Sequence, residues 1–144
     1  MKRAGFTMIE LIFVIVILGI LAAVAIPKLA ATRDDAKIAK ASTEVATLVS
    51  DLGAYYTAQG SFGTLEDMTN VLVTNEDQNI SVGSNYQVNG IDCIDFNTTA
   101  AAAADGNISV SKSAGDALCD KIQTVLTDKG MIKTHSFGGS KVNW

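Results

Sequence analysis

Few side chains in this 144-residue sequence could carry covalent or metal chemistry. The chain has two cysteines, Cys93 and Cys119, and one histidine, His135. A structural zinc site takes four such ligands, so the usual kind is excluded. In an oxidising compartment two cysteines form a disulfide, which we predict here, with two separate buried thiols as the alternative. A cysteine held in a disulfide is no nucleophile, so we expect no Cys–His catalytic pair and no enzyme.

An acidic cluster at residues 75–79 reads Asn-Glu-Asp-Gln-Asn and offers oxygen atoms of the kind that calcium binds. Its spacing is not that of an EF-hand loop. We therefore predict a solvated turn at this cluster, and we expect no metal and no cofactor for the chain.

Asparagine-linked glycosylation is a further chemistry that the sequence supports. Three Asn-x-Ser/Thr triplets begin at Asn79, Asn97 and Asn107, and each has an aspartate two positions earlier. The longer pattern, Asp/Glu-x-Asn-x-Ser/Thr, resembles the acceptor requirement of bacterial N-oligosaccharyltransferases. Asp and Asn also cluster in turns because both side chains bond to their own backbone, which is the alternative explanation. The three asparagines are candidate glycosylation sites.

Glu10 is unusual because it lies in an apolar segment. Residues 6–26 are apolar except for Thr7 and Glu10. Twenty-one helical residues span about 30 Å, enough to cross the core of a bilayer. A carboxylate in such a segment costs about 2.5–3.5 kcal/mol on insertion scales and usually has a partner. The segment itself offers none, so we expect a positive group from the chain terminus or from another subunit.

Two simpler interpretations of this segment leave Glu10 without a role. A secretory signal peptide ends in a small-x-small cleavage site, which Ala23 and Ala25 could imitate. A plain membrane anchor needs no carboxylate at all.

The helical pattern continues beyond the apolar segment. Residues 6–59 would form a rod of about 80 Å, longer than a compact domain of this size needs. Gly60 is its expected end. Pro27 removes a backbone hydrogen bond, so we predict a kink there, and Gly19 is a second weak point. After Pro27, apolar residues recur at helical spacing along one face: Ile38, Ala41, Val45, Leu48, Val49, Leu52, Tyr55 and Tyr56.

The N-terminal string GFTMIELIFVIVILGILAAVAIPKL closely resembles the N-terminus of type IV pilins and type II secretion pseudopilins. The resemblance implies that a prepilin peptidase cuts between Gly5 and Phe6 and that Phe6 is then N-methylated. It also implies that Glu10, with Thr7 nearby, meets the terminal amine of a neighbouring subunit during assembly. Lys2 and Arg3 would hold the leader on the cytoplasmic side before cleavage. In filaments of this family, the stretch between such a glycine and proline can lose its helical structure.

Partners and location follow from the same resemblance. The implied partners are other copies of the chain in a helical homopolymer, prepilin peptidase and inner-membrane assembly platform proteins. The formal charge of −4 provides no basic footprint, so no specific nucleic acid is predicted. The subunit would cross the inner membrane once, with its head in the periplasm. After assembly it would lie in a surface filament or a periplasmic pseudopilus.

The rest of the chain predicts a small αβ head. Asn89-Gly90 is a type I′ hairpin signal between strands at 86–88 and 91–96. Thr64 could cap a short helix, and residues 113–129 carry a helical apolar stripe that Gly130 ends. Further strands are expected at 80–82, 107–111, 131–137 and 141–144.

These observations predict an α+β fold. A long N-terminal helix, transmembrane in its first half and amphipathic in its second, would carry a disulfide-linked head with a short antiparallel sheet. The expected divisions are a leader (1–5), a transmembrane assembly helix (6–27), an amphipathic helix half (28–60) and a head (61–144). The predicted function is a pilin of a type IV pilus-like filament. The alternatives are a pseudopilin of a type II secretion or DNA-uptake (competence) machine and, outside this class, a monomeric membrane-anchored binding domain.

Overall fold

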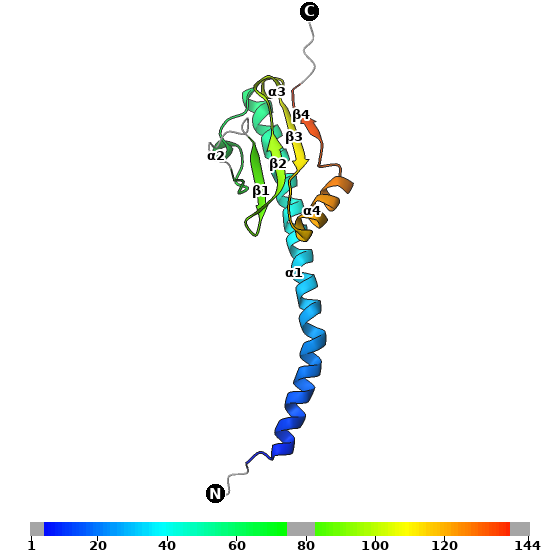
Figure 1. Ribbon diagram of the computed structural model, residues 1–144. Coiled ribbons are helices and arrows are strands. Elements are labelled where there is room, and N and C mark those ends of the chain that lie inside the picture. Colours follow the sequence, from blue (N-terminus) through cyan, green and yellow to red (C-terminus); the bar gives the residue numbers. More distant parts are fainter. Residues whose placement is uncertain (1–4, 75–82, 139–144) are drawn as a thin grey trace, which may run out of the picture. The chain divides into compact units, whose positions relative to one another are not determined.

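The computed structural model describes residues 5–74 and 83–138 (Figure 1). Its chain divides into two compact units, Met1–Ala36 and Lys37–Trp144, which are treated separately below. The expected strands at 80–82 and 141–144, the cluster at 75–79 and Asn79 lie outside the described residues.

Helix α1, Met8–Gln59, runs through both units. Gly60 follows it with a φ of +75°, a conformation that favours glycine, and its N–H bonds to the carbonyl of Tyr56. The predicted long helix and its end are therefore confirmed. Pro27 lies inside α1, and the helix continues on both sides of it. The kink expected at Pro27 stays a prediction.

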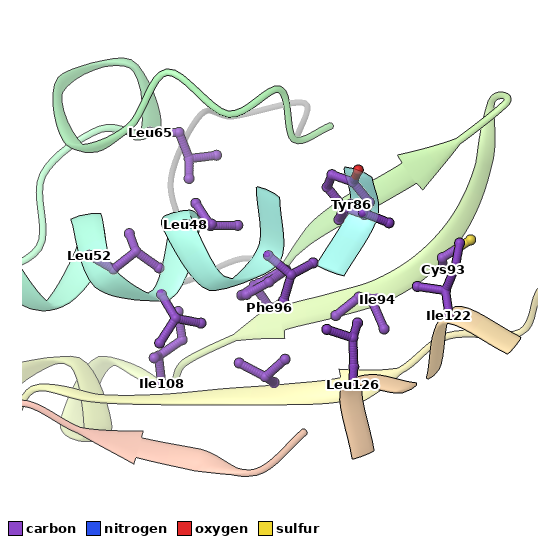
Figure 2. Packing of buried hydrophobic residues seen from close by; sticks show 14 of the residues in the cluster. Leu48, Leu52, Leu65, Tyr86, Cys93, Ile94, Phe96, Ile108, Ile122 and Leu126 are labelled. Atoms are coloured by element: carbon purple, nitrogen blue, oxygen red, sulfur yellow. The ribbon is translucent and has the colours of Figure 1, made fainter. Parts of the chain in front are cut away.

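The core of the second unit is built on one face of α1. The helix buries a stripe at three- and four-residue spacing: Ala41, Val45, Leu48, Val49, Leu52 and Tyr56. The first five of these side chains pack with Ile94 and Phe96 of the sheet and with Ile122 and Leu126 of a later helix (Figure 2). The amphipathic pattern after Pro27 thus predicted the buried face correctly.

The sheet has four antiparallel strands in the order of the sequence. They are β1 (Ser84–Val88), β2 (Ile91–Asn97), β3 (Asn107–Lys112) and β4 (Thr134–Ser136). Asn89 and Gly90 join β1 to β2 with φ of +56° and +79°, as a type I′ turn requires. The α+β fold with a short antiparallel sheet is confirmed.

Two short helices occur in the described part of the second unit. Helix α2 (Leu65–Met68) follows Thr64, whose hydroxyl donates to Asp67 and caps no backbone N–H. Helix α3 (Ala100–Ala104) was not predicted, although alanine has the highest helix propensity and the hydroxyl of Thr99 accepts from the N–H of Ala102.

Helix α4 (Ala117–Asp128) begins four residues later than the expected 113–129, because Asp116 caps it. The Asp116 carboxylate accepts from the N–H groups of Leu118 and Cys119. Ser113 instead bonds to β2 through its N–H, which donates to the carbonyl of Cys93. The strand expected at 131–137 was also too long, since only Thr134–Ser136 pairs with β3.

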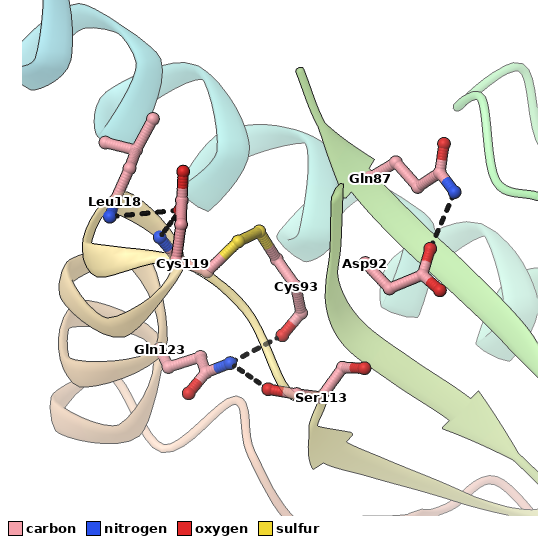
Figure 3. Close-up of a disulfide and its surroundings, with 8 residues drawn as sticks. Gln87, Asp92, Cys93, Ser113, Leu118, Cys119 and Gln123 are labelled. Carbon is pink, nitrogen blue, oxygen red and sulfur yellow. Dashed lines mark hydrogen bonds between the residues drawn. A yellow bond between two sulfur atoms is a disulfide. The ribbon is translucent and has the colours of Figure 1, made fainter. Parts of the chain in front are cut away.

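The predicted disulfide is confirmed, and a β-bulge positions it. Tyr86 pairs with Ile94 but its neighbour Gln87 pairs with Asp92, so Cys93 has no counterpart in β1. The bulge interrupts the alternation of the strand, and Cys93 and Ile94 are both fully buried. Cys93 thereby meets Cys119 of α4, with a Cα–Cα separation of 5.1 Å that suits a disulfide (Figure 3).

A buried glutamine reinforces this connection. The Gln123 amide donates to the carbonyls of Cys93, at 2.8 Å, and Ser113, at 2.7 Å (Figure 3). One side chain therefore satisfies two carbonyl groups near the bulge. The disulfide and this amide together fasten α4 to β2.

Gly53 allows α1 to approach the end of the chain closely. A Cβ built at Gly53 would lie 2.7 Å from a ring carbon of Phe137. The Phe137 ring also meets Phe62, with centroids 6.3 Å apart, and Phe62 meets Tyr56 at 5.0 Å. A helical glycine is thus needed where these rings cover the end of α1.

Tyr86 joins β1 to α1 through a partly buried polar contact. Its side chain is 4% exposed, and its hydroxyl donates to a Glu44 carboxylate oxygen at 2.5 Å. Lys40 lies 3.5 Å from the other oxygen of Glu44. Burial, and secondarily the hydrogen bond and charge of Glu44, raise the pKa of Tyr86.

We expect reduction of the disulfide to destabilise the soluble part of the chain (residues 28–144). The bond joins residues 26 apart, and the chain-entropy model gives about 3.5 kcal/mol for such a loop. The midpoint temperature of thermal unfolding should fall by about 10–20 °C when reductant is added. A Cys93→Ala, Cys119→Ala variant should unfold at the same temperature with and without reductant. Unchanged melting of the native sequence, or two titratable thiols before reduction, would contradict the prediction.

We expect alkaline pH to destabilise the same fragment partly through Tyr86. Its phenol titrates near pH 10 in the unfolded chain but higher in the folded one, so above pH 10 the unfolded state binds fewer protons. The free energy of unfolding should therefore fall as pH rises, by up to about 1.4 kcal/mol per pH unit from this group. Urea unfolding between pH 8 and 11 should show a shallower decline for Tyr86→Phe, and equal slopes would count against this assignment.

Candidate assembly site at the start of the long helix

The residues before α1 form an exposed, non-helical segment. Gly5, Phe6 and Thr7 precede the first helical residue, Met8, and the Phe6 side chain is 90% exposed. A Cβ added at Gly5 would meet no atom within 4 Å. The Gly5–Phe6 peptide bond therefore lies outside regular secondary structure.

Thr7 and Glu10 form a reciprocal cap at the start of α1. The Thr7 N–H and hydroxyl donate to Glu10 Oε2 at 2.8 and 2.7 Å. The Glu10 N–H in turn approaches Thr7 Oγ1 at 3.3 Å. This is a capping box, in which the first side chain and the one three residues later satisfy N–H groups that the helix leaves without partners.

The cap corrects one sequence-based expectation. We expected no partner for Glu10 within its own segment, but Thr7 supplies two hydrogen bonds. The error came from looking only for a positive charge, whereas helix N-termini provide N–H donors and a favourable dipole. The signal that we missed is the spacing Thr-x-x-Glu at the head of an apolar run.

The Glu10 carboxylate keeps one oxygen for another partner. Both bonds from Thr7 end on Oε2. Within the part of the chain that the structure describes, Oε1 of Glu10 makes no hydrogen bond or ion pair. The cap therefore orients the carboxylate without using all of its accepting capacity.

The first half of α1 is apolar, and its side chains are exposed. Large hydrophobic side chains from Met8 to Leu29 are 40–77% exposed. Among the described residues, α1 is the helix long and apolar enough to cross a membrane, and none of its apolar window is buried inside the protein. Gly19 and Pro27 both lie in this stretch, and a Cβ at Gly19 would meet open space. Such an apolar surface must be covered by lipid or by other helices.

The remaining predicted site residues lie in the second unit. Cys93 and Cys119 are joined, as described above. Asn97 is exposed at the end of β2, and Asn107 is partly buried at the start of β3. Among the described residues, no group of three or more His, Cys, Asp or Glu side chains is placed to hold a metal ion.

Comparisons with known proteins match this N-terminal site. Residues 1–26 fit the family model of the prokaryotic N-terminal methylation motif. The chain is therefore of the class that carries this motif, and its predicted resemblance to pilins and pseudopilins is confirmed. The motif and the exposed apolar helix support membrane anchoring.

Particular relatives come from secretion systems and from a pilus. Type II secretion system core protein G of Vibrio cholerae serotype O1 is 36% identical over 73 residues, 51% of this chain and 50% of the relative. Core protein G of Pseudomonas aeruginosa is 39% identical over 54 residues, 38% of each chain. The type IV major pilin protein PilA of Myxococcus xanthus is 42% identical over 66 residues, 46% of this chain and 27% of the relative.

These matches cover only part of each protein. The chain spans about half the length of the first of these curated relatives. No solved structure matches it significantly. The family model covers residues 1–26, at the N-terminal end of the chain.

We expect loss of the Thr7 hydroxyl to loosen the first turn of α1. Thr7→Val keeps the shape of the side chain but removes one bond to Glu10 and the acceptor for the Glu10 N–H. Loss of such a cap costs about 1 kcal/mol, or roughly fivefold in local opening. Hydrogen exchange of the Glu10 amide in detergent micelles should accelerate accordingly. Thr7→Ser is the matched control, and equal acceleration in both variants would exclude the cap as the cause.

Proposed function

We propose that this chain is a structural subunit, a pilin, of a type IV pilus-like filament. In this proposal prepilin peptidase cuts between Gly5 and Phe6, and Phe6 is then N-methylated. The observation that carries the proposal is the exposed apolar segment of α1 from Met8 to Leu29, headed by a capped carboxylate at Glu10.

The exposed helix supports a subunit that moves from lipid into a filament. Before assembly, lipid would cover the apolar side chains of α1, with the inner membrane crossed once and the head in the periplasm. After assembly, the same side chains would pack against α1 of other copies. The change is feasible because the hydrocarbon core and a packed helix bundle are both apolar surroundings.

Charge complementarity supports the role of Glu10 in this step. Cleavage after Gly5 removes Lys2 and Arg3, leaving nine basic and fifteen acidic residues and a formal charge of −6. It also creates an ammonium group on Phe6. The ammonium of a neighbouring subunit can bind Oε1 of Glu10 while Thr7 holds Oε2. Burying this charge pair in an apolar filament core costs far less free energy than burying the carboxylate alone.

The remaining parts of the proposal concern the division of the chain and its partners. Residues 1–5 would be the leader, 6–27 the membrane and assembly helix, 28–60 its amphipathic continuation and 61–144 the head. Partners would be other copies of the chain, prepilin peptidase and inner-membrane assembly platform proteins. The role is structural and not enzymatic, with no specific nucleic acid bound.

A pseudopilin of a type II secretion machine is the second candidate, and a DNA-uptake machine would use the same parts. The names of several relatives favour it, since the core protein G matches come from different bacteria. The two functions differ in where the filament ends: a pilus extends from the cell surface, whereas a pseudopilus stays in the periplasm. A monomeric anchored domain, in contrast, would stay uncleaved.

We expect the charge of Glu10 to be needed for filaments but not for folding. Glu10→Gln is the informative variant, because glutamine also serves in a capping box and only the charge is lost. Filaments should disappear or thin out in Glu10→Gln and in Glu10→Ala, while membrane insertion and the Cys93–Cys119 disulfide remain. Electron microscopy of cells and sheared filaments, with intact-mass measurement of the subunit, gives both readouts.

The controls separate assembly from capping and from processing. Thr7→Ser should form filaments normally, and the mass of every variant should show loss of residues 1–5 and gain of one methyl group. Normal filament yield from Glu10→Gln would refute the charge mechanism. A native-sequence subunit that keeps residues 1–5 would refute the proposed function itself.

A further inference from the structure

The outer face of the sheet is almost entirely polar. Ile94, Phe96, Ile108 and Val110 point into the core, so the alternate residues of β2 and β3 point outward. These outward residues carry carboxylate, amide and hydroxyl groups: Asp95, Asn97, Asn107, Ser109, Ser111, Thr134 and Ser136. One end of this face forms an open hollow of about 360 Å³ that is lined by residues of both the Asn97 and the Asn107 patterns.

Two of the three Asp-x-Asn-x-Ser/Thr patterns end up on this face. In the first, Asp95 and Asn97 lie two residues apart on β2 and therefore share the outward face, while Phe96 between them is fully buried. Asn97 and Thr99 are both exposed. The folded chain thus presents the asparagine and the hydroxyl of the pattern to solvent, with the partly buried Asp95 on the same face of the sheet.

The Asn97 pattern also sits where the backbone leaves the sheet. Asn97 is the last residue of β2 and pairs with Ser109 of β3. Thr98 and Thr99 belong to neither strand nor helix. The Thr98 hydroxyl donates to the carbonyl of Asn107 at the start of β3, at 2.6 Å, and the Thr99 hydroxyl accepts from the N–H of Ala102. Thr98 is buried, at 4% exposed, so release of the segment 97–99 requires this residue to leave its place and its bond to Asn107 to break. Only one paired edge, that between Asn97 and Ser109 of β3, has to open as well.

The Asn107 pattern is held far more firmly. Asn107, Ile108 and Ser109 pair with Ser136, His135 and Thr134 of β4. Ser109 pairs with Asn97 on the other side, so β3 is bonded along both edges here. Ile108 is fully buried. An enzyme that must draw residues 105–109 into its own active site would have to strip β3 from both neighbours.

We propose that Asn97 is an N-glycosylation site that the folded head presents to a bacterial oligosaccharyltransferase, and that Asn107 is not. The donor would be a lipid-linked oligosaccharide diphosphate. The Asn97 carboxamide nitrogen bonds to C1 of the first sugar, the bond from C1 to the diphosphate oxygen breaks, and the lipid diphosphate leaves. The carboxamide gives up one proton, so no oxidant or reductant is needed.

Each residue of the pattern has a distinct part in recognition. The Thr99 hydroxyl is a hydrogen-bond partner for the enzyme, and the Asp95 carboxylate, on the same face as Asn97, suits a basic group at its acceptor groove. Glycosylation in the cell requires the head to lie outside the cytoplasm and so rests on the proposed function. The chemical preference for Asn97 does not, and it can be tested separately.

The test uses the full chain, folded in detergent, with a purified bacterial oligosaccharyltransferase and a lipid-linked oligosaccharide of known mass. Every protein carries Asn79→Gln, because Asn79 lies outside the described residues. Glycopeptide mass spectrometry then compares occupancy at Asn97 and Asn107. Synthetic peptides of residues 94–101 and 104–111, which have no fold, measure the intrinsic reactivity of each pattern.

We expect both peptides to be modified, and the folded chain to be modified at Asn97 at least about tenfold more than at Asn107, because local opening of β3 limits access. Asn97→Gln and Asp95→Asn should abolish the product, whereas the matched controls Asp95→Glu and Thr99→Ser should retain it. Equal occupancy at Asn107, an unmodified Asn97 in the folded chain, or an unreactive 94–101 peptide would each overturn the proposal.

The same assay in living cells distinguishes this inference from the proposed function. Co-expression with the transferase and its donor in a bacterium that has no glycosylation of its own yields a subunit whose intact mass reports two events. A processed subunit without a sugar would contradict glycosylation alone. An uncleaved subunit would contradict the pilin proposal and leave the in vitro preference for Asn97 standing.

Discussion

An apolar helix must be buried somewhere, and this chain does not bury the first half of α1 itself. From Met8 to Leu29 the large side chains are exposed, whereas from Ala41 to Tyr56 the same helix forms the centre of a packed core. One continuous element therefore faces two environments: the protein interior in its second half, and lipid or other subunits in its first. This constraint also explains why Glu10 needs partners, because an unpaired charge in apolar surroundings is costly.

The capping box shows how a local device serves a collective role. Thr7 satisfies one oxygen of Glu10, holds the side chain at the helix start and leaves the second oxygen available. A carboxylate that is fixed in advance loses little conformational freedom when another charge approaches it. In the head, a single local feature also has two effects. The bulge at Cys93 positions both the disulfide and the carbonyl that Gln123 binds.

Sequence reasoning predicted the parts of the fold that depend on local pattern. The long helix, its buried stripe, the Asn89-Gly90 turn and the Cys93–Cys119 bond all follow from spacing or residue type. The bulge could not be predicted, because Cys93 and Ile94 read as one buried and one exposed position until the register of β1 is known. Helix α4 begins at Ala117, after the cap at Asp116, because Ser113 bonds to β2. The role of Gly53 depends on Phe137, 84 positions away. Thr7 is different, because the Thr-x-x-Glu spacing of a capping box is present in the sequence and was not used in the prediction.

The covalent continuity of α1 has a mechanical consequence. In the proposed filament, tension would reach each head through α1, whose buried face packs against the sheet and α4 of that head. The disulfide joins β2 to α4 and leaves α1 outside the crosslinked loop, so it carries none of that load directly. The packing of Val45, Leu48 and Leu52 against the sheet would resist extraction of the helix. If force separated α1 from the sheet, the disulfide would still hold β2 and α4 together. Helix α1 could then pack against them again once the force fell.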